Sequence, residues 1–318
     1  MILFTADWHI KLGQKNVPVS WAKNRYLKFF DDLFEIERTK NIHLHIVGGD
    51  IFDRMPTLEE LELYFDWVKA VTVKTIIYDG NHEATKKNKT FFTYLKEVTH
   101  GINNKVTIID ENFYDEEQGF GILPYCELHK KDWQSFFPEN VPIFTHVRGE
   151  IPPHVKPEVS LDLFDKFSVV FAGDLHAHSN CQRNIVYPGS PMTTSFHRNN
   201  VETGYILIDS NNYNWTWHKL ELPQLIRKTV SDPIEMISTD YDHTVYEIEG
   251  NMKELADIKD SELLSKKIVK RNTEVALILD EQDSIQTHLE QYLTYILKLD
   301  ENTITEVVSL FNDYAKSS

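Results

Sequence analysis

The chain has 318 residues, of which 41% are hydrophobic and 26% are charged, a composition that excludes a disordered or fibrous protein. Its 49 acidic and 33 basic residues give a net charge of −16, which argues against a free-standing nucleic-acid-binding protein because phosphate contacts need Lys and Arg. An enzyme that meets phosphates through bound cations is still compatible with this charge. No apolar run is long enough to span a membrane, and Cys126 and Cys181 cannot form a disulfide framework, so we expect a cytoplasmic protein with reduced thiols.

The first 220 residues alternate apolar β-type runs with amphipathic stretches, which is the pattern of an α/β fold. The chain begins directly with a predicted strand and lacks the basic segment of a signal peptide. The predicted strands are, in chain order, Ile2–Ala6, His43–Gly48, Thr75–Tyr78, Val106–Ile109, Gly121–Leu123, Pro142–Thr145, Ser168–Ala172 and Asn184–Tyr187. A hairpin of Tyr205–Asp209 and Trp215–Leu220 is predicted to close this domain.

Two amphipathic helices are predicted between the early strands. Ser20 is the expected cap of the first helix, and Thr57 followed by Glu60 predicts a capping box at the start of the second. The buried stripes are expected to consist of Leu27, Phe30 and Phe34 in the first helix and of Leu61, Phe65 and Val68 in the second.

A break near Pro223 ends this first domain. The elements predicted beyond it are a strand at Thr244–Glu249, a helix from Asn251 to about Lys266, a strand at Glu274–Leu279, and helices at Ser284–Lys298 and Thr303–Ala315. The two last helices carry apolar stripes formed by Leu289, Leu293, Ile296 and Leu297 and by Ile304, Val307, Val308 and Phe311. We therefore expect three parts: residues 1–222, a small α+β domain at 223–283, and a helical segment at 284–318.

Polar residues recur directly after predicted strands. The segments concerned are Asp7-Trp8-His9, Asp50 with Asp53-Arg54, Gly80-Asn81-His82-Glu83, Thr145-His146, and Gly173-Asp174-Leu175-His176-Ala177-His178. In α/β sheets, ligands collect outside the carboxyl ends of the strands. These segments are therefore predicted to line a single pocket.

The residue types in this pocket indicate its chemistry. Carboxylate oxygens, an amide oxygen and imidazole nitrogens suit divalent cations such as Mn, Fe or Zn, and the scarcity of Cys argues against a structural zinc site. About seven ligands suit two ions, which at roughly 3.5–4 Å from each other clamp the attacking and leaving oxygens of a phosphoryl transfer. Such a pair needs a bridging carboxylate, for which Asp50 is the best candidate, and it needs no Ser or Cys nucleophile.

The ordered series Asp-x-His, Gly-Asp-x-x-Asp-Arg, Gly-Asn-His-Glu, a lone His and a late His motif resembles the calcineurin-like metallophosphoesterase superfamily. A finer resemblance is to the exonuclease subunit of SbcCD-type DNA-repair complexes, a branch that includes compact bacteriophage recombination nucleases. This finer match is carried by Thr5-Ala6-Asp7-Trp8-His9-Ile10, Gly49-Asp50-Ile51-Phe52-Asp53 and Tyr187-Pro188-Gly189-Ser190-Pro191. The resemblance reaches to about residue 220 and implies a β-sandwich flanked by helices, followed by a capping domain.

The resemblance also implies a role for each matching residue. Two divalent ions are expected, Mn²⁺ with Mg²⁺ as the alternative. The implied ligands are Asp7, His9 and Asp50 with a late residue for one ion, and Asp50, Asn81 and His146 with another late residue for the second. His82 would protonate the leaving oxygen or orient the phosphate, and Asp53 would support the ligands from behind.

One segment departs from the family pattern, whose usual late motif is Gly-His-x-His. Aligned without a gap on Gly173, this chain has Asp174 and His176 at the two ligand positions, whereas a slip of two residues would use His176 and His178. The gapless alignment is favoured because it keeps the distance from the preceding strand and because Asp is a competent ligand. All three residues are therefore candidates.

Four basic residues near the motifs, Lys86, Lys87, Lys89 and Arg148, are candidates for contacts with a DNA backbone, although a solvated loop explains them equally well.

The implied activity is a 3′-to-5′ exonuclease with some endonuclease capacity, acting in DNA recombination, repair or degradation. The implied partners are DNA and an SMC-like ATPase gripped by the C-terminal helices, with a homodimer inside a heterotetramer, in the host cytoplasm if the chain is phage-encoded. The chain has no Gly-x-x-x-x-Gly-Lys-Ser/Thr loop of its own for ATP. Two alternatives are a phosphoprotein or nucleotide phosphatase of the same superfamily, and a non-catalytic DNA-end scaffold.

Overall fold

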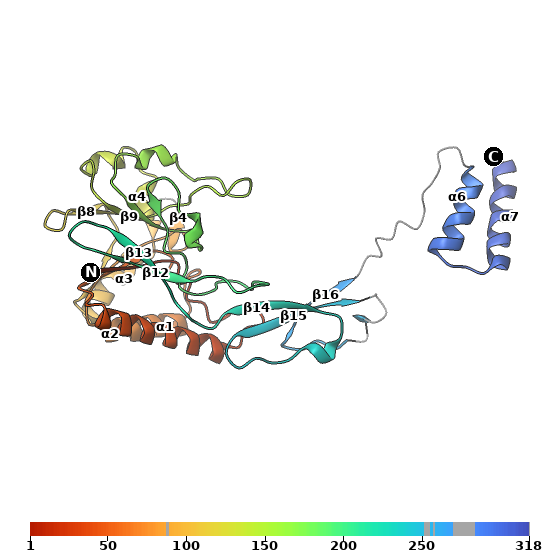
Figure 1. The fold of residues 1–318 in the computed structure, drawn as a ribbon, viewed down its shortest axis with the longest axis horizontal. Helices are drawn as coiled ribbons and strands as arrows, with labels where there is room; N and C mark the ends of the chain where they lie inside the picture. Colours follow the sequence, from red (N-terminus) through yellow and green to blue (C-terminus); the bar gives the residue numbers. More distant parts are fainter. Residues whose placement is uncertain (87–88, 251–254, 257, 270–283, 318) are drawn as a thin grey trace. The chain divides into compact units, whose positions relative to one another are not determined.

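The computed structural model describes residues 1–318 except 87–88, 251–254, 257, 270–283 and 318. The chain divides into two compact units (Figure 1). The first consists of Met1–Ile248 with Ile258–Lys267, and the second of Glu249–Asp257 with Ile268–Ser318.

Two β-sheets form the centre of the first unit. The six-stranded sheet has the order β13-β12-β1-β2-β3-β6 and the five-stranded sheet the order β11-β10-β9-β8-β7. The strands of the first sheet are β1 (Ile2–Thr5), β2 (Leu44–Gly48), β3 (Lys74–Tyr78), β6 (Val106–Ile109), β12 (Gly204–Ile208) and β13 (Trp215–Lys219). Those of the second are β7 (Phe113–Asp115), β8 (Phe120–Leu123), β9 (Ile143–His146), β10 (Val170–Gly173) and β11 (Ile185–Val186).

The two sheets pack face to face as a sandwich. Phe4 on β1 packs against Phe144 on β9 and Phe171 on β10, with ring centroids 5.4 and 6.0 Å apart. Leu3, the residue between Ile2 and Phe4, lies in a different cluster, because successive side chains of a strand point to opposite faces. The expected α/β fold with two packed sheets is confirmed.

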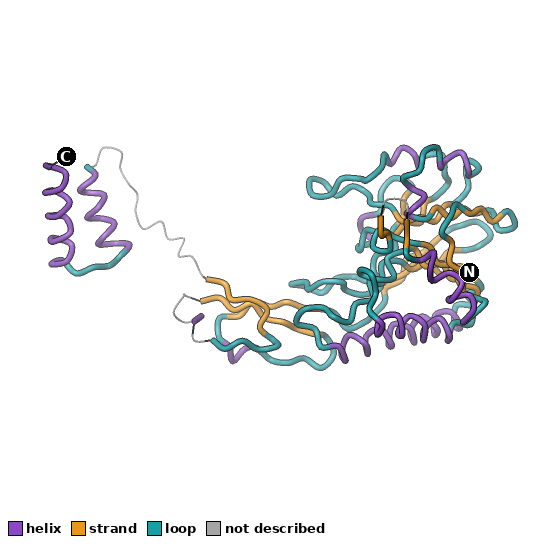
Figure 2. Tube along the Cα trace, turned by 180° about the vertical axis from the view of Figure 1, so that it is seen from behind, coloured by secondary structure: helices purple, strands orange, loops and turns teal. Residues whose placement is uncertain are grey.

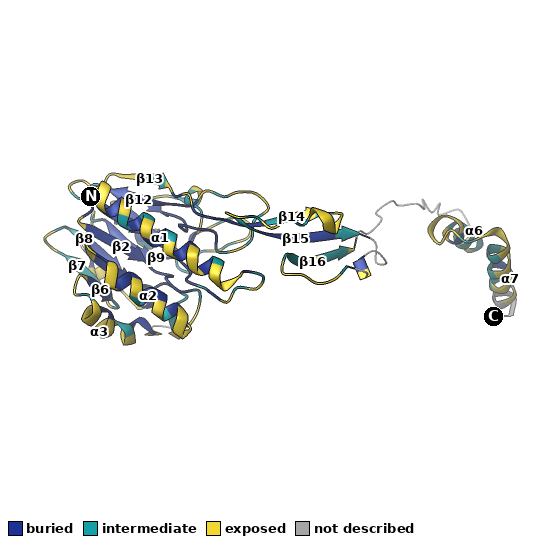
Figure 3. Cartoon of the chain, turned by 90° about the horizontal axis from the view of Figure 1, so that it is seen from below, coloured by how far each residue is buried: buried dark blue, intermediate teal, exposed yellow. Residues whose placement is uncertain are grey.

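Helices cover the outer face of the six-stranded sheet. They are α1 (Val19–Thr39), α2 (Leu58–Ala70) and α3 (Phe92–Ile102). Phe29 and Trp67 of α1 and α2 share one buried cluster with Leu3 of β1. Figure 3 shows this arrangement as one buried and one exposed side along α1 and α2, and Figure 2 shows the helices beside the strands from behind.

The predicted start of α1 is wrong. The helix begins at Val19 with Pro18 as its N-cap, so Ser20 lies inside the first turn and caps nothing. Leu27 is 42% exposed, because the buried face instead runs through Tyr26, one residue earlier. Of the predicted stripe, Phe30 is buried and Phe34 is partly buried.

The capping box of α2 is confirmed. The Thr57 side chain accepts a hydrogen bond from the Glu60 N–H, and the Glu60 side chain accepts one from the Thr57 N–H. The buried stripe follows Leu63, Tyr64, Trp67 and Val68, whereas Leu61 and Phe65 are only partly buried.

A third sheet follows the sandwich, in the order β14-β15-β16. Its strands are β14 (Leu225–Val230), which the sequence did not predict, β15 (His243–Gly250) and β16 (Leu264–Val269). The helix predicted from Asn251 to about Lys266 is wrong over its last residues. Residues 258–263 are not helical, and residues 264–266 belong to β16, where strand pairing overrides the helical preference of Leu264 and Lys266. The strand predicted at Glu274–Leu279 lies outside the described residues.

Short elements complete the first unit. They are β4 (Ala84–Lys86), β5 (Lys89–Thr90), α4 (Tyr125–Leu128), and 3₁₀ turns at Trp133–Phe136, Leu161–Phe164, His178–Asn180 and Pro233–Glu235.

The second unit contains the two predicted C-terminal helices. These are α6 (Ile285–Gln291), extended by a π-helical turn at Tyr292–Ile296, and α7 (Glu301–Ser317), which lies beside α6. Leu293 and Val308 are buried, whereas Ile296 and Leu297 of the predicted stripe are exposed. Of the helices in the described part of the chain, none is long and apolar enough to cross a membrane. The three-part division at 222 and 283 stays a prediction.

Candidate metal centre

The predicted site residues converge at one edge of the two sheets because they follow strands that run parallel. β1, β2 and β3 are parallel neighbours in one sheet, and β9 and β10 are parallel neighbours in the other. The chain turns sharply after three of these strands, with φ of 58° at Asp7, 46° at His9, 51° at Asp50 and 99° at Asp174. Left-handed backbone at four non-glycine residues is unusual, and it clusters at functional sites.

Asp50 occupies the middle of the cluster. Its Oδ2 atom lies 3.4 Å from Nε2 of His146, 3.6 Å from Nε2 of His9 and 3.9 Å from Nε2 of His82. The Asn81 Oδ1 atom lies 3.0 Å from the same nitrogen of His146. One carboxylate oxygen among three imidazoles is the geometry expected of a bridging ligand.

Ligand atoms gather in three overlapping groups, each within 4.8 Å: Asp7, His9 and His176; Asp7, Asp50 and His146; and His9, Asp50 and His82. Within the described residues, the buried Oδ2 atom of Asp7 has no hydrogen-bond partner. Buried polar atoms of this kind are normally paired. Oxygen and imidazole donors in these positions fit two divalent cations.

Burial dominates the electrostatics of the cluster. Loss of solvent raises the pKa of Asp7 to about 8 and lowers the pKa of His9 to about 3. Burial also opposes charge on Asp50 and His146, but their mutual attraction outweighs it, so the pKa of Asp50 falls and the pKa of His146 rises. Buried acids at this density favour a compensating cation.

The late motif points in two directions. The Asp174 N–H donates to Oδ1 of Asp7 at 3.0 Å, and the Nε2 atoms of His176 and His9 lie 3.0 Å from each other. The structure thus brings Asp174 and His176 to the cluster.

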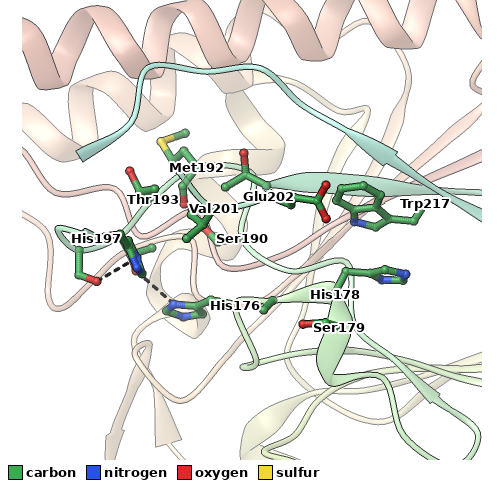
Figure 4. Close-up of a pocket in the computed structure, with 14 residues that line it drawn as sticks. His176, His178, Ser179, Ser190, Met192, Thr193, His197, Val201, Glu202 and Trp217 are labelled. Carbon is green, nitrogen blue, oxygen red and sulfur yellow. Dashed lines mark hydrogen bonds between the residues drawn. The ribbon is translucent and has the colours of Figure 1, made fainter. Parts of the chain in front are cut away.

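His178 does not join them. Figure 4 shows its ring turned away from His176 and beside Trp217, on which it stacks with a centroid separation of 5.2 Å. Its Nδ1 atom lies 2.6 Å from the carbonyl oxygen of Tyr187. His176 and His178 both line a pocket of about 450 Å³, whose lining residues are drawn in Figure 4.

His82 and Asp53 lie at the rim of the cluster. Nδ1 of His82 donates to the backbone carbonyl of Asp53 at 2.5 Å, which directs Nε2 towards Asp50. The Asp53 carboxylate lies 2.7 Å from Nζ of Lys11 and 3.8 Å from Nδ1 of His9.

Glu83 has a role that sequence reasoning missed. Its fully buried carboxylate accepts hydrogen bonds from the N–H groups of Asp50, Phe52 and Gly80 at 2.9, 2.9 and 2.8 Å. It therefore ties the turn after β2 to the turn after β3. The sequence signal that could have indicated this role is the position of Glu83 in the Gly-Asn-His-Glu segment directly after a predicted strand. Gly80 is needed at this contact, because a Cβ there would overlap Asp50.

The candidate DNA-binding residues differ in their exposure and in their distance from the cluster. Lys86 is exposed and lines a shallow pocket together with Asn81, whereas the exposed Lys89 lines a separate pocket. Lys87 lies outside the described residues. Arg148 is engaged with Asp174 through two hydrogen bonds of 3.1 Å each.

Known proteins resemble this chain in sequence or in fold. Residues 1–178 match the family model described as calcineurin-like phosphoesterase. The chain is 40% identical over 324 residues to "Probable exonuclease subunit 1" of Escherichia phage T5, with 99% of this chain and 98% of the relative covered. A solved structure, that of TT1561 of Thermus thermophilus, covers 69% of this chain and is itself covered to 98%, with 10% identity and a TM-score of 0.43. The chain therefore belongs to the calcineurin-like phosphoesterase family, whose members use divalent metal ions.

Proposed function

We propose that this chain is a metal-dependent deoxyribonuclease, a 3′-to-5′ exonuclease with endonuclease activity. The observation that carries the proposal is the convergence of carboxylates, imidazoles and an amide on Asp50, in a chain 40% identical to a phage exonuclease subunit. The expected ion is Mn²⁺, with Mg²⁺ as the alternative, as the family resemblance implies; the carboxylate and amide oxygens of the cluster suit both ions.

The contacts described above support a division of the ligands. One ion would be held by Asp7, His9, Asp50 and His176, and the second by Asp50, Asn81, His146 and Asp174. Two such cations lower the pKa of water and neutralise charge on the phosphate.

The protein's own residues then act on the phosphodiester. Hydrolysis adds water at phosphorus and breaks the bond to the 3′ oxygen, which must gain a proton. His82 is oriented for this, because its Nδ1 is tied to the Asp53 carbonyl while its Nε2 faces the cluster. The Asp53 carboxylate, paired with Lys11, lies behind His9 and would hold that ring in place. Lys86, beside Asn81, would contact the DNA backbone.

The proposal is tested by comparing two substrates under the same Mn²⁺ concentration. The full chain should release nucleotides from linear DNA and little phosphate from a phosphopeptide or a free nucleotide. Phosphate release without DNA cleavage would replace the nuclease by a phosphatase of the same family. DNA binding without any hydrolysis would instead support the alternative of a non-catalytic DNA-end scaffold.

We further propose that the chain works as one subunit of a complex with an SMC-like ATPase, as a homodimer inside a heterotetramer, in recombination, repair or degradation of DNA in the cytoplasm. Support comes from the relative's name, which calls it subunit 1, and from the C-terminal helical segment. There Tyr295 of the π-helical turn, Leu297 directly after it and Leu310 of α7 are exposed. Deleting residues 284–318 should abolish co-purification with the ATPase while hydrolysis of a small phosphodiester persists. Retained co-purification would assign the contact to another surface.

A further inference from the structure

Arg148 contacts the carboxylate of Asp174, one of the proposed metal ligands, through its guanidinium group. Its Nε atom donates to Oδ2 of Asp174 and its Nη2 atom donates to Oδ1, each at 3.1 Å. Two parallel hydrogen bonds of this kind fix the plane of the carboxylate as well as its position. The Asp174 side chain is 5% exposed, whereas that of Arg148 is 42% exposed, so the guanidinium closes the carboxylate off from solvent.

The strand register creates this pair. His146 at the end of β9 lies opposite Gly173 at the end of β10, so the residues that follow the two strands meet beyond the sheet. Arg148 is further anchored through its own N–H, which donates to Oε1 of Glu158 at 3.0 Å. The pair is therefore built into the same turns that bring His146 and Asp174 to the cluster.

Charge decides what the pair does. Oδ1 of Asp174 accepts a hydrogen bond from Arg148 and also lies 3.9 Å from Nε2 of His146. Asp174 and His146 are both proposed ligands of the second cation, so only the Asp174 carboxylate separates the guanidinium from that cation's position. A carboxylate paired with a guanidinium carries no net charge. A cation therefore meets an Asp174–Arg148 pair whose net charge is zero, as that of a neutral imidazole is. An unpaired Asp174 would instead add one buried negative charge.

We infer that Arg148 is a positioning residue that serves as the internal counter-cation of Asp174, stabilising the metal-free site and weakening cation binding at the Asp174 position. This role rests on the function proposed above, because it assumes cations in the cluster. It follows that Arg148 and a divalent cation compete for the same negative charge, and that a bound cation is held less tightly than four full ligands alone would hold it.

The test uses the full chain, with Mn²⁺ as the probe and with no DNA present. Arg148→Met removes the charge and the hydrogen bonds at similar length, and Arg148→Lys keeps the charge without the two-pronged contact. Arg183→Met is the matched control, because Arg183 also bridges carboxylates, those of Asp162 and Asp165, away from the cluster. The measurements are the melting temperature in chelator and the Mn²⁺ dissociation constant and stoichiometry by titration calorimetry.

Arg148→Met should lower the melting temperature of the metal-free protein and bind Mn²⁺ at least about 10-fold more tightly, which corresponds to about 1.4 kcal/mol. Added Mn²⁺ should therefore raise its melting temperature more than it raises that of the unaltered chain. Arg148→Lys should restore most of the original Mn²⁺ affinity, and Arg183→Met should leave that affinity unchanged.

An Mn²⁺ affinity that falls or stays the same in Arg148→Met would overturn the inference, and the proposed function would stand. Weaker DNA binding by Arg148→Met at unchanged Mn²⁺ affinity, in a separate fluorescence-anisotropy titration with duplex DNA, would assign Arg148 to the DNA backbone and would also overturn the inference. Failure of the unaltered chain to bind any Mn²⁺ would refute the proposed function and the inference with it. If Arg148→Met does not fold, the comparison is made in Asp174→Asn, where replacing Arg148 should no longer tighten Mn²⁺ binding; tightening there would refute the pairing.

Discussion

Replacing Glu83 by Gln tests whether one carboxylate holds the two strand ends of the cluster together. The substitution keeps the size and shape of the side chain. The carboxylate accepts three N–H groups, two at Oε2 and one at Oε1, and is fully buried. An amide has one accepting oxygen, so one of the three N–H groups would face an NH₂ group instead.

The expected loss follows from this count. Burial raises the pKa of Glu83 to about 8, so the comparison is made at about pH 9, where the carboxylate is charged. Hydrogen bonds to a charged group contribute about 1.5–3 kcal/mol each, and an unsatisfied buried donor costs about 1–3 kcal/mol. Relief from burying a charge opposes part of this loss. We expect Glu83→Gln to lower the free energy of unfolding by about 3 kcal/mol, which for a unit of this size corresponds to about 6–12 °C in melting temperature.

The assay is thermal unfolding in the presence of chelator, followed by circular dichroism, with Mn²⁺ titration as a second measurement. Mn²⁺ affinity should fall as well, because the Asp50 N–H is one of the three donors. Glu62→Gln, on the exposed side of α2, is the control and should change the free energy of unfolding by less than about 0.5 kcal/mol. A melting temperature for Glu83→Gln that is indistinguishable from that of the unaltered chain would refute the reasoning.

Three more results are expected. His82→Ala should keep its Mn²⁺ stoichiometry while DNA cleavage falls roughly 10²–10⁴-fold, and unchanged cleavage would exclude His82 as the proton donor. His176→Gln should weaken Mn²⁺ binding measured by calorimetry, whereas His178→Gln should not. Weaker binding in His178→Gln alone would refute the gapless alignment of the late motif. Because burial raises the pKa of Asp7 to about 8, the folded metal-free protein holds a proton there that the unfolded chain has lost. Its stability should therefore fall as the pH rises towards about 8, and added Mn²⁺ should reduce this loss, which melting curves with and without chelator at about pH 6.5 and about pH 8 would measure.

The positions of strands in the first unit were readable from the sequence because buried parallel strands are continuous apolar runs between polar turns. In the third sheet the prediction of Thr244–Glu249 is confirmed by β15, but β14 and β16 were not predicted, because half of each consists of exposed or partly exposed polar residues whose periodicity is weak. The start of α1 failed for a local reason, since Pro18 supplies the N-cap and Ser20 lies inside the helix.

The site was more predictable than the fold around it, since residues directly after strands need no knowledge of packing to be placed at one edge. Contacts between turns were not predictable in the same way. Glu83 joins the turns after β2 and β3, and Arg148 with Asp174 joins the turns after β9 and β10. Each pair of turns follows neighbouring strands of one sheet, and the contacts depend on the backbone path of each turn. A sequence indicates that such residues are polar, but it does not indicate which backbone groups they meet.

The late motif illustrates how backbone geometry selects among neighbouring histidines. Leu175 is buried, and the residues on either side of it, Asp174 and His176, both reach the cluster. A 3₁₀ turn then begins at His178, and the Tyr187 carbonyl holds that ring on the far side. The gapless alignment therefore fits the structure, and with it comes a carboxylate at position 174. A carboxylate carries a charge that a neutral imidazole does not, and Arg148 compensates that charge. Substitution of Asp174 and Arg148 together is therefore expected to be tolerated better than substitution of either residue alone.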